Sequence, residues 1–575
     1  MPRTAKRIRA KVPAWARDAI WYQIFPERFR NGAPGSNPQS ADCFDHPIKG
    51  WSINPWGQDW YRQEPWEAEQ GDFFKSVYCR RYGGDLVGLR SKLDYLQDLG
   101  VNAIYLNPIF MAPSLHKYDA ACLHHVDPTL GPDRAGDLDL LARAGETEHP
   151  GSWIWTAADR CLVELVADIH RRGMHIILDG VFNHVGTRFF AFKDLQQRGK
   201  KSKYADWFRV TKWRRDGSFD YEGWFGHKGL PELARDERSL VEPVRRYIFD
   251  ITKRWMDPDG DGDPSDGVDG WRLDVAFCVP HGFWKAWRRC VKSINPDAFL
   301  TGEIVDLATD FLRGDEFDSV MNYMWLFPTV RFFSRGPSPI SASELWKELG
   351  RMVDAYPTDV QYVLQNLLDS HDVGRIATVL ENELPLKSEW QCYFDLSRAQ
   401  ANPKLVTTRP RPETIDVLKQ LVIFQMTYLG APMIYYGTEV GLWGANDPDN
   451  RQPMLWEDVR YELERRALSG TCRTSLRTPD MALFDFFRKA MALRRDHRAL
   501  RRGKLQPLES GSDRVLAFAR GSGRDRIVVA LNASDQPATF TLAQRGRDIW
   551  DGGRAISKGR KTIPARGWLV IGAGA

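Results

Sequence analysis

The sequence predicts an α/β protein built on a (β/α)8 TIM barrel, with an excursion domain after the third strand and an antiparallel β-sandwich at the C-terminus. Eight short apolar runs alternate with amphipathic helical stretches over most of the 575 residues. Polar side chains follow several of these runs, and after about residue 494 the pattern changes to alternating strands with Gly-rich turns. Eight βα units close into a barrel whose chemistry lies at the carboxyl ends of the strands.

The eight expected strands are short apolar runs in chain order. They span residues 19–25, 102–106, 175–179, 270–275, 299–303, 317–323, 361–367 and 432–436. Amphipathic stretches lie between them, at 85–99, 159–172, 241–256, 282–293 and 413–429. In the second of these stretches the apolar residues Leu162, Leu165 and Ile169 recur at helical spacing. The segment 384–414 is polar with several prolines, so we expect an inserted loop there.

The same pattern divides the chain into a barrel and three further parts. Residues 1–18 are expected to form an N-terminal extension, and residues 19–184 with 240–494 the catalytic barrel. Residues 185–239 are long for the loop of a βα unit and rich in basic and aromatic residues, so we expect an excursion domain that leans over the site. Residues 495–575 are expected to form the small β-sandwich.

Composition and charge exclude several classes of function. The net charge is only +5, and the basic residues are dispersed apart from a run between Arg3 and Lys11, so we expect neither nucleic acid nor a membrane as partner. No apolar stretch reaches the length of about 18 residues that a membrane span needs, and no secretory signal is evident. The eight cysteines are scattered without a Cys-x-x-Cys pair, which favours reduced thiols and a cytoplasmic location.

Three carboxylates at or near expected strand ends carry the predicted chemistry. Asp274 follows Arg272 by two residues on one strand, so both side chains point to the same face and the guanidinium favours an ionised carboxylate. Glu303 ends the next strand, and Asp372 lies just past another. Retaining glycoside hydrolysis needs a carboxylate nucleophile and a carboxylic acid. We therefore expect Asp274 to be the nucleophile and Glu303 the general acid and base, with Asp372 bound to sugar hydroxyls.

Further polar side chains are expected around these carboxylates. Asp179, after the third strand, would hold Arg272. His184 and His371 would donate hydrogen bonds to sugar hydroxyls, and Tyr118 would stack beneath the ring at the cleavage point. Each piece alone has a plain structural interpretation, because an Asp-Gly pair is usually a turn and a lone buried histidine is usually a satisfied core residue. Their combination at the strand ends of one barrel favours a catalytic site.

With these residues in place, the chain resembles the α-amylase superfamily of retaining α-glucan-active enzymes from about residue 19 to its end. The regions that carry the resemblance are 116–119, 179–184, 270–274, 302–303, 370–372 and 447–451. The resemblance implies the same roles for Asp274, Glu303 and Asp372. It also implies that the subsite for the sugar on the non-reducing side is lined by His116, Tyr118, His184, Arg272, His371, Asp447 and Arg451.

Within that superfamily the chain looks most like the neopullulanase, cyclomaltodextrinase and maltogenic amylase group, on segments 21–29, 82–86, 107–110, 116–119 and 320–323. Two segments depart from the group. Residues 230–233 read Leu-Pro-Glu-Leu in place of Met-Pro-Lys-Leu, and 277–279 read Phe-Cys-Val in place of Asn-Glu-Val. The group's N-terminal β-domain is not expected in this sequence, and neither is dimerisation through it. The oligomeric state stays open.

Calcium is the one metal that the sequence raises. Relatives often bind Ca²⁺ in a loop after the first strand, but here Ala33 replaces its carboxylate. A second loop opens like an EF-hand with Asp257, Asp259 and Asp261, although Val268 stands where the closing Glu belongs. A structural Ca²⁺ and a solvated acidic turn are the two interpretations of that loop. The expected mechanism requires no cofactor.

The sequence thus predicts an enzyme that hydrolyses α-1,4-glucosidic bonds in cyclodextrins, malto-oligosaccharides, pullulan or starch through a covalent glycosyl-enzyme intermediate, with transglycosylation as a further outcome. The alternative in the same superfamily is an α-glucosidase, or a transferase or isomerase that acts on a disaccharide. The shape of segments 185–239 and 384–414 would decide between these readings. A non-catalytic glucan-binding protein is the remaining alternative, but such relatives typically lose catalytic carboxylates, and this chain keeps all three.

Overall fold

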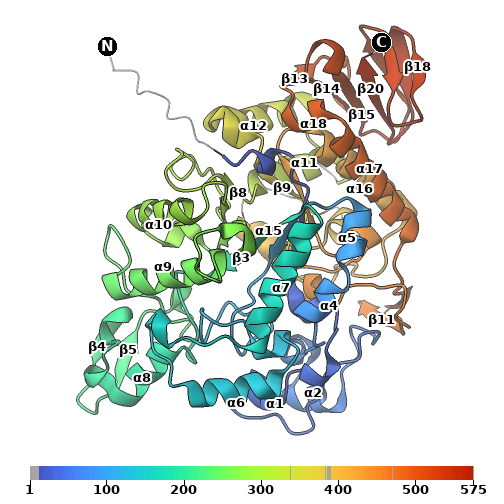
Figure 1. Ribbon diagram of the computed structural model, residues 1–575. Helices are drawn as coiled ribbons and strands as arrows, with labels where there is room; N and C mark the ends of the chain where they lie inside the picture. Colours follow the sequence, from blue (N-terminus) through green and yellow to red (C-terminus); the bar gives the residue numbers. More distant parts are fainter. Residues whose placement is uncertain (1–11, 337–338, 383, 385–389, 469–470, 574–575) are drawn as a thin grey trace.

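An eight-stranded parallel barrel forms the centre of the computed structural model, which describes residues 12–336, 339–382, 384, 390–468 and 471–573 (Figure 1). The strands are β1 (Trp21–Ile24), β2 (Ala103–Leu106), β3 (His175–Gly180), β6 (Gly270–Leu273), β7 (Phe299–Gly302), β8 (Ser319–Val320), β9 (Gln365–Leu367) and β10 (Ala431–Tyr435). Their order in the sheet is β8-β7-β6-β3-β2-β1-β10-β9. A parallel bridge between Met321 and Gln365 joins the two ends of that order. The predicted barrel is confirmed, and each strand overlaps its expected range.

The barrel strands are almost entirely buried, as strands covered on both faces should be. Every residue of β1, β2, β6, β7 and β10 is buried. At the start of β6, Gly270 has a φ of +150°, and a Cβ there would lie 1.9 Å from the carbonyl oxygen of Phe299. Only glycine allows this close approach of β6 to β7, two strands that carry active-site carboxyls at their ends.

The helices cover the outside of the barrel (Figure 1). In α7 (Ala157–Arg171) the N-cap Thr156 accepts a hydrogen bond from the amide of Asp159, whose carboxylate reaches back to the cap. The apolar face of α7 predicted from the sequence is buried. The predicted helix over 85–99 is divided into α4 (Leu86–Arg90) and α5 (Leu93–Leu99). The Ser91 hydroxyl donates to the carbonyl oxygen of Gly88 at this break.

The other helices of the barrel region are short before β2, and most of those after β3 are longer. The short ones are α1 (Ser40–Cys43), α2 (Pro65–Gln70) and α3 (Phe73–Ser76), followed by α6 (Arg134–Ala144) between β2 and α7. Later come α9 (Glu242–Met256), α10 (His281–Ile294), α11 (Tyr323–Phe333), α12 (Ala342–Ala355), α13 (Thr358–Gln361), α14 (Ile376–Glu381), α15 (Trp390–Ser397) and α16 (Pro412–Thr427). Helix α15 lies where a loop was expected, and its Tyr393 is buried against Phe327. Residues 385–389 of that predicted loop lie outside the described residues.

The excursion between β3 and α9 contains α8 (Phe190–Arg198) and an antiparallel hairpin of β4 (Val210–Trp213) and β5 (Phe219–Tyr221). In Figure 1 it lies at the edge of the molecule far from the C-terminal sheets. Aromatic rings of Phe192, Phe208 and Tyr221 pack together in it. An isolated bridge between His184 and Glu232 ties its end to the loop after β3, next to the barrel centre.

The C-terminal part is a sandwich of two antiparallel sheets, as predicted. The larger sheet has the order β13 (Leu505–Leu508), β14 (Val515–Arg520), β15 (Ile527–Asn532), β20 (Trp568–Ala573), β17 (Gly546–Asp548) and β18 (Arg554–Ile556). The smaller pairs β16 (Ala538–Leu542) with β19 (Gly559–Ile563). Val515 and Ile571 of the first sheet pack against Phe540 and Ile563 of the second. Helices α17 (Met481–Asp496) and α18 (Arg498–Arg502) and the hairpin β11 (Leu463–Leu468) with β12 (Thr471–Leu476) precede the sandwich.

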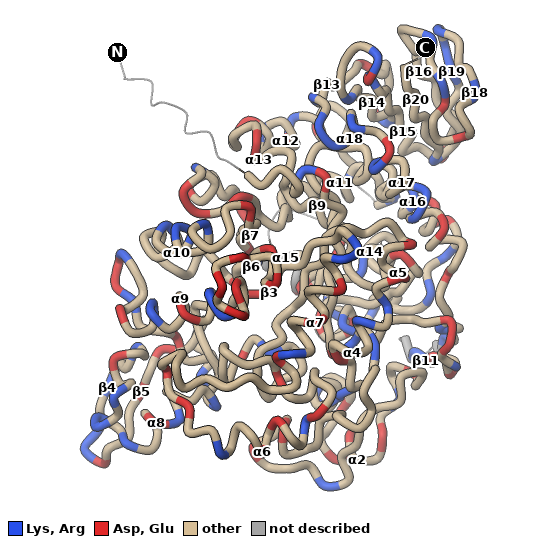
Figure 2. Tube along the Cα trace, in the orientation of Figure 1, with Lys and Arg blue, Asp and Glu red and all other residues tan. Residues whose placement is uncertain are grey.

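Charged residues of both signs are interspersed along the whole trace (Figure 2). The dispersed basic residues expected from the sequence are therefore seen in the fold. Within the described residues, no helix has the length and apolar character that a membrane crossing requires.

Candidate active site

Three carboxyl groups from neighbouring barrel strands meet at one arginine. Nη1 of Arg272, on β6, lies 2.8 Å from Oδ1 of Asp179 at the end of β3 and 2.9 Å from Oδ1 of Asp274 just past β6. Its Nη2 lies 3.0 Å from Oε2 of Glu303, just past β7. The strand ends β3, β6 and β7 are adjacent in the sheet. The barrel therefore brings together the residues that the sequence placed at separate strand ends.

Burial makes this cluster favour a bound proton. The guanidinium of Arg272 is fully buried, and three carboxyls share its single charge. Burial raises the pKa of Asp274 well above its usual value, and the charges of Glu303 and Asp179 add to this while Arg272 opposes it. The predicted effect of Arg272 on Asp274 is thus present, but burial and the neighbouring carboxyls outweigh it. One proton retained among these groups is what acid catalysis by such a site requires.

Two tyrosines fix the carboxylate of Asp179. The hydroxyls of Tyr105 and Tyr118 donate to its Oδ2 over 2.7 and 2.9 Å. The Tyr118 hydroxyl in turn accepts from Nδ2 of Asn107 over 3.0 Å and lies 2.6 Å from Nε2 of His371. The structure therefore places Tyr118 as a link between Asp179 and His371, with its ring parallel to the imidazole.

Hydrogen bonding sets the tautomer of His371. Nε2 of Gln23 donates to Nδ1 of His371 over 2.9 Å and to Oδ1 of Asn107 over 3.0 Å. Nδ1 is then an acceptor, so the imidazole carries its hydrogen on Nε2. Burial lowers the pKa of His371 well below its usual value, which keeps the ring neutral. The hydroxyl oxygen of Tyr118 accepts this hydrogen, because that hydroxyl donates its own to Asp179, and Nε2 also lies 3.1 Å from Oδ2 of Asp372.

A second arginine, Arg451, contacts carboxylates on the other side of the site. Nη2 of Arg451 lies 3.4 Å from Oδ1 of Asp372, and its Nη1 lies 3.3 Å from Oδ1 of Asp447. The side chain of Asp372 keeps about a quarter of its surface exposed, so it faces open space. Burial and the charge of Glu303 raise the pKa of Asp372 to about 7, although Arg451 opposes the shift. Asp372, Asp447 and Arg451 are therefore brought together as the resemblance implied.

Of the two remaining predicted histidines, His184 is buried and His116 is half-buried, and both are neutral. Burial lowers the pKa of both His116 and His184 to about 3. Nδ1 of His116 accepts from the amide of Tyr118 over 3.1 Å. In the described part of the chain, Nε2 of His184 is buried without a hydrogen-bond partner, while the ring of Trp224 lies against the imidazole at 5.3 Å. An orphaned nitrogen beside an aromatic face is suited to a sugar hydroxyl and its ring.

Glu232, which stands where the resembling group has a lysine, pairs with an arginine of the excursion domain. Oε2 of Glu232 lies 2.8 Å from Nη2 of Arg235, whose Nη1 donates to Oδ1 of Asn183 over 2.6 Å. Asn183 precedes His184 in the loop after β3. The glutamate that stands in place of a lysine therefore helps to hold the loop of His184, and its charge is compensated.

Sequence reasoning missed four residues of the site. Gln23 on β1, Tyr105 on β2 and Asn107 hold the predicted residues by hydrogen bonds. The fourth, Val275, has a φ of +37°, and its amide donates to Oε2 of Glu303 over 2.9 Å. A β-branched residue is rare in this left-handed region. For Gln23 and Tyr105 the available signal was their polar side chain in an apolar strand run. For Val275 the sequence offered none.

The acidic loop before β6 differs in detail from the prediction. Carboxylate oxygens of Asp257, Asp259 and Asp266 lie within 4.8 Å of one another. Asp261 lies outside this group, and its Oδ1 accepts from the amide of Asp263 over 2.7 Å. Asp266 therefore replaces Asp261 as the third member, because the chain turns back through η10 (Pro264–Asp266).

Comparisons with known proteins agree with this geometry. The family model for the alpha amylase catalytic domain matches residues 23–146 and 157–394. Neopullulanase 2 from Thermoactinomyces vulgaris is 35% identical over 94% of this chain and 74% of that protein. Cyclomaltodextrinase from Geobacillus thermopakistaniensis (strain MAS1) is 32% identical over 94% of this chain and 73% of that protein.

Solved structures agree as well. Cyclic alpha-maltosyl-(1→6)-maltose hydrolase from Arthrobacter globiformis matches with a TM-score of 0.69 and 26% identity, over 97% of this chain and 99% of that chain. The barrel, the carboxyl cluster at its strand ends and the length of these matches lead to one conclusion. The chain is a glycoside hydrolase of the alpha-amylase family, related to neopullulanase and cyclomaltodextrinase.

Proposed function

We propose that the chain hydrolyses α-1,4-glucosidic bonds with retention of configuration, through a covalent glycosyl-enzyme intermediate. The observation that carries this proposal is the pair Asp274 and Glu303, whose carboxyl groups bind the two terminal nitrogens of one guanidinium, Arg272. A shared guanidinium holds two carboxyls near each other, and retaining enzymes need a short separation of about 5–5.5 Å. An inverting enzyme needs a wider gap that leaves room for water.

In the first step of the proposed reaction, Glu303 gives its proton to the glycosidic oxygen and an oxygen of Asp274 attacks the anomeric carbon. The bond to the leaving sugar breaks and an ester to Asp274 forms. In the second step, Glu303 takes a proton from water, and the water oxygen displaces Asp274. A sugar hydroxyl in place of water gives transglycosylation. The amide of Val275 donates to Glu303, which supports the orientation of this carboxyl.

The surrounding residues are proposed to hold the sugar whose glycosidic bond is cleaved. The imidazole of His371 and the carboxylate of Asp372 lie together at one side of the cluster, where they are suited to contact hydroxyls of the distorted ring. His116, His184, Asp447 and Arg451 would bind further hydroxyls of the same sugar. Asp179 would act through Arg272, which makes it a positioning residue.

The proposed substrates are cyclodextrins, malto-oligosaccharides, pullulan or starch. The names of the similar proteins, neopullulanase and cyclomaltodextrinase, support this range. An α-glucosidase, or a transferase or isomerase acting on a disaccharide, is the competing proposal within the family. The free thiols of the described cysteines support a cytoplasmic location.

The first experiment follows products from β-cyclodextrin and soluble starch at equal mass by chromatography, with the anomeric configuration read by NMR. Faster turnover of cyclodextrin to maltose and glucose, with the α-anomer released first, is expected. Preference for starch would indicate an open cleft, and no product from either would favour the disaccharide-acting proposal. Release of the β-anomer would contradict the retaining mechanism.

Asp274→Asn tests the nucleophile directly. We expect turnover to fall by at least about 10⁴-fold, while the dissociation constant for β-cyclodextrin, measured by calorimetry, stays close to that of the unchanged chain. Asp318→Asn is the matched control, because Asp318 is also buried and paired with an arginine, Arg288, over 2.7 Å. Unchanged turnover in Asp274→Asn would refute the assignment.

A further inference from the structure

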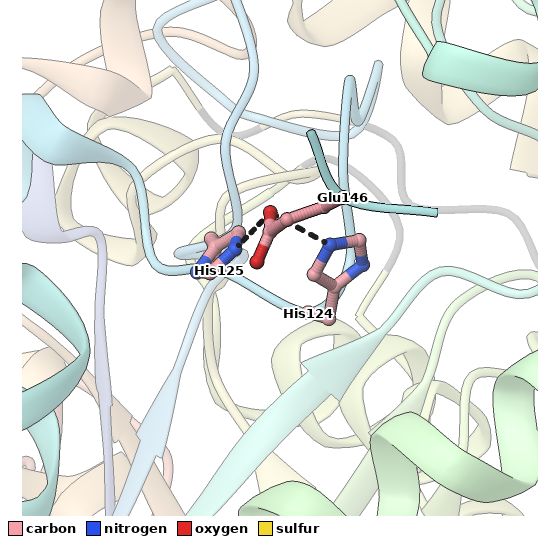
Figure 3. Close-up of side chains that lie close together, drawn as sticks. All are labelled: His124, His125 and Glu146. Atoms are coloured by element: carbon pink, nitrogen blue, oxygen red, sulfur yellow. Dashed lines mark hydrogen bonds and ion pairs between the residues drawn. The ribbon is translucent and has the colours of Figure 1, made fainter. Parts of the chain in front are cut away.

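Two adjacent histidines and a glutamate converge outside the catalytic cluster, in the loop that follows β2 (Figure 3). Nε2 of His125 lies 2.8 Å from Oε2 of Glu146, and Nε2 of His124 lies 3.5 Å from the same oxygen. His124 and His125 are buried, while Glu146, which follows α6, keeps 12% of its side chain exposed. Figure 3 shows both imidazoles turned toward one carboxylate.

The other nitrogen of each imidazole is held by a separate group. Nδ1 of His125 lies 2.7 Å from Oδ2 of Asp159, in the first turn of α7. Nδ1 of His124 lies 2.8 Å from the hydroxyl of Tyr247, on α9. The carboxylate of Asp159 requires a hydrogen on Nδ1 of His125, and the hydroxyl of Tyr247 can accept one from Nδ1 of His124, so Nε2 of both rings faces Glu146. Carboxylate and hydroxyl partners of this kind orient the histidines of metal sites.

The donor atoms lie close enough together for a tetrahedral metal site, all within 4.8 Å of one another. Bonds of about 2.0–2.1 Å at tetrahedral angles put neighbouring ligand atoms roughly 3.3 Å apart. The two distances from Oε2 of Glu146, 2.8 and 3.5 Å, lie on either side of that value. Oε1 of Glu146 accepts from the amide of Ile154 over 2.6 Å, which leaves Oε2 as the ligand atom. Two imidazoles exclude Ca²⁺ and Mg²⁺, which take oxygen ligands.

We propose that Nε2 of His124, Nε2 of His125 and Oε2 of Glu146 bind one Zn²⁺ ion, with water at the fourth position. The ion would replace the proton that otherwise lies between His125 and Glu146, so binding releases a proton to solvent.

The ion would fasten two segments of the structure to each other. Glu146 leads into residues 147–156, which the alpha amylase family model leaves unmatched. His124 and His125 lie a few residues after His116 and Tyr118, in the same loop. A bond through Zn²⁺ therefore ties the 147–156 segment to the loop that contributes to the substrate site. The role is structural, because the catalytic carboxyls lie elsewhere.

The test measures metal directly. The full chain is stripped with a chelator, incubated with ZnCl₂, desalted and assayed for zinc by mass spectrometry. We expect about one Zn²⁺ per chain, a higher melting temperature with ZnCl₂ than with the chelator, and visible absorption bands of four-coordinate Co²⁺ when CoCl₂ replaces ZnCl₂. His124→Gln and Glu146→Gln should each lose the ion, and Tyr247→Phe should weaken binding by about 10-fold.

A similar cluster supplies the control. His170 and His175 lie 2.9 and 3.1 Å from Asp269, but they contact its two different oxygens, so their nitrogens do not converge. His170→Gln should therefore keep the full zinc content. A zinc content below about 0.1 ion per unchanged chain, where the site predicts one ion, would overturn the proposal. Zinc retained in both His124→Gln and Glu146→Gln, or lost equally in His170→Gln, would overturn it too. If a variant fails to fold, the zinc content and the chelator-dependent melting of the unchanged chain decide.

Discussion

Replacing Arg272 by lysine tests the electrostatic reasoning for the whole site. The guanidinium contacts Asp179 and Asp274 through Nη1 and Glu303 through Nη2. A lysine ammonium is a single point charge and cannot bridge three carboxyls in this way. If it keeps the contact with Asp179, the site loses two charge-assisted contacts, each of about 1.5–3 kcal/mol. A loss of about 3–6 kcal/mol in the transition state lowers kcat/KM by about 10²–10⁴-fold.

The pH profile of kcat/KM gives an independent measure of the effect of Arg272 on Asp274. The attraction of Arg272 opposes the burial that raises the pKa of Asp274. Without the guanidinium the pKa of Asp274 rises further, so the ionised form that the proposed nucleophile needs appears only at higher pH. The acid limb of the kcat/KM profile for β-cyclodextrin should therefore move to higher pH in Arg272→Lys.

The control for this variant is Arg288→Lys. Arg288 is also buried, and it contacts Asp318 over 2.7 Å away from the catalytic carboxyls. The Arg288→Lys substitution should lower the melting temperature without moving the acid limb of the kcat/KM profile. A kcat/KM for Arg272→Lys within tenfold of the unchanged chain, which corresponds to about 1.4 kcal/mol, together with an unmoved acid limb, would refute the reasoning.

Two smaller changes test a missed neighbour and a buried charge. Tyr105→Phe removes one hydrogen-bond donor from Asp179. It should lower the free energy of unfolding by about 1–3 kcal/mol and reduce kcat. A stability in urea and a kcat equal to those of the unchanged chain would contradict the role of this hydroxyl. Burial raises the pKa of Glu464 to about 7. The folded chain therefore binds an extra proton between the unfolded pKa of about 4.3 and pH 7. Stability from this group is complete below that window and falls as pH rises through it, by about 4 kcal/mol. Glu464→Gln should flatten the fall seen by urea unfolding between pH 5 and 8, and an unchanged slope would refute this.

The barrel could be predicted because its strands are buried on both faces and so appear as continuous apolar runs. β1, β2 and β6 show this clearly, with every residue buried. Short-range details were harder to predict. The break between α4 and α5 depends on a local hydrogen bond of Ser91, and α15 depends on the burial of Tyr393 by a distant helix. Neither feature changes the spacing of apolar residues, from which helices and strands are predicted.

The carboxyls of the site could be predicted for a different reason. Arg272 and Asp274 lie two residues apart on one strand, so the strand period alone puts them on one face. Tyr105 and Gln23 have no such local relation to their partners. Their roles arise because β1, β2 and β3 are neighbours in the sheet, and a polar residue in a buried strand is otherwise indistinguishable from a satisfied core residue.

The balance of charge in the site also depends on the fold. Arg272 contacts Asp179, Asp274 and Glu303, and Arg451 contacts Asp372 and Asp447, so the described carboxyls around these two arginines outnumber their charges. The pKa of Asp372, raised to about 7, is one consequence, because burial and, after it, repulsion by Glu303 disfavour its ionised form. The carboxyls could be found one by one along the chain, whereas this excess appears only when the strand ends meet. A site assembled in this way takes up protons near neutral pH, and the proposed roles of neighbouring carboxyls as acid and nucleophile depend on that property.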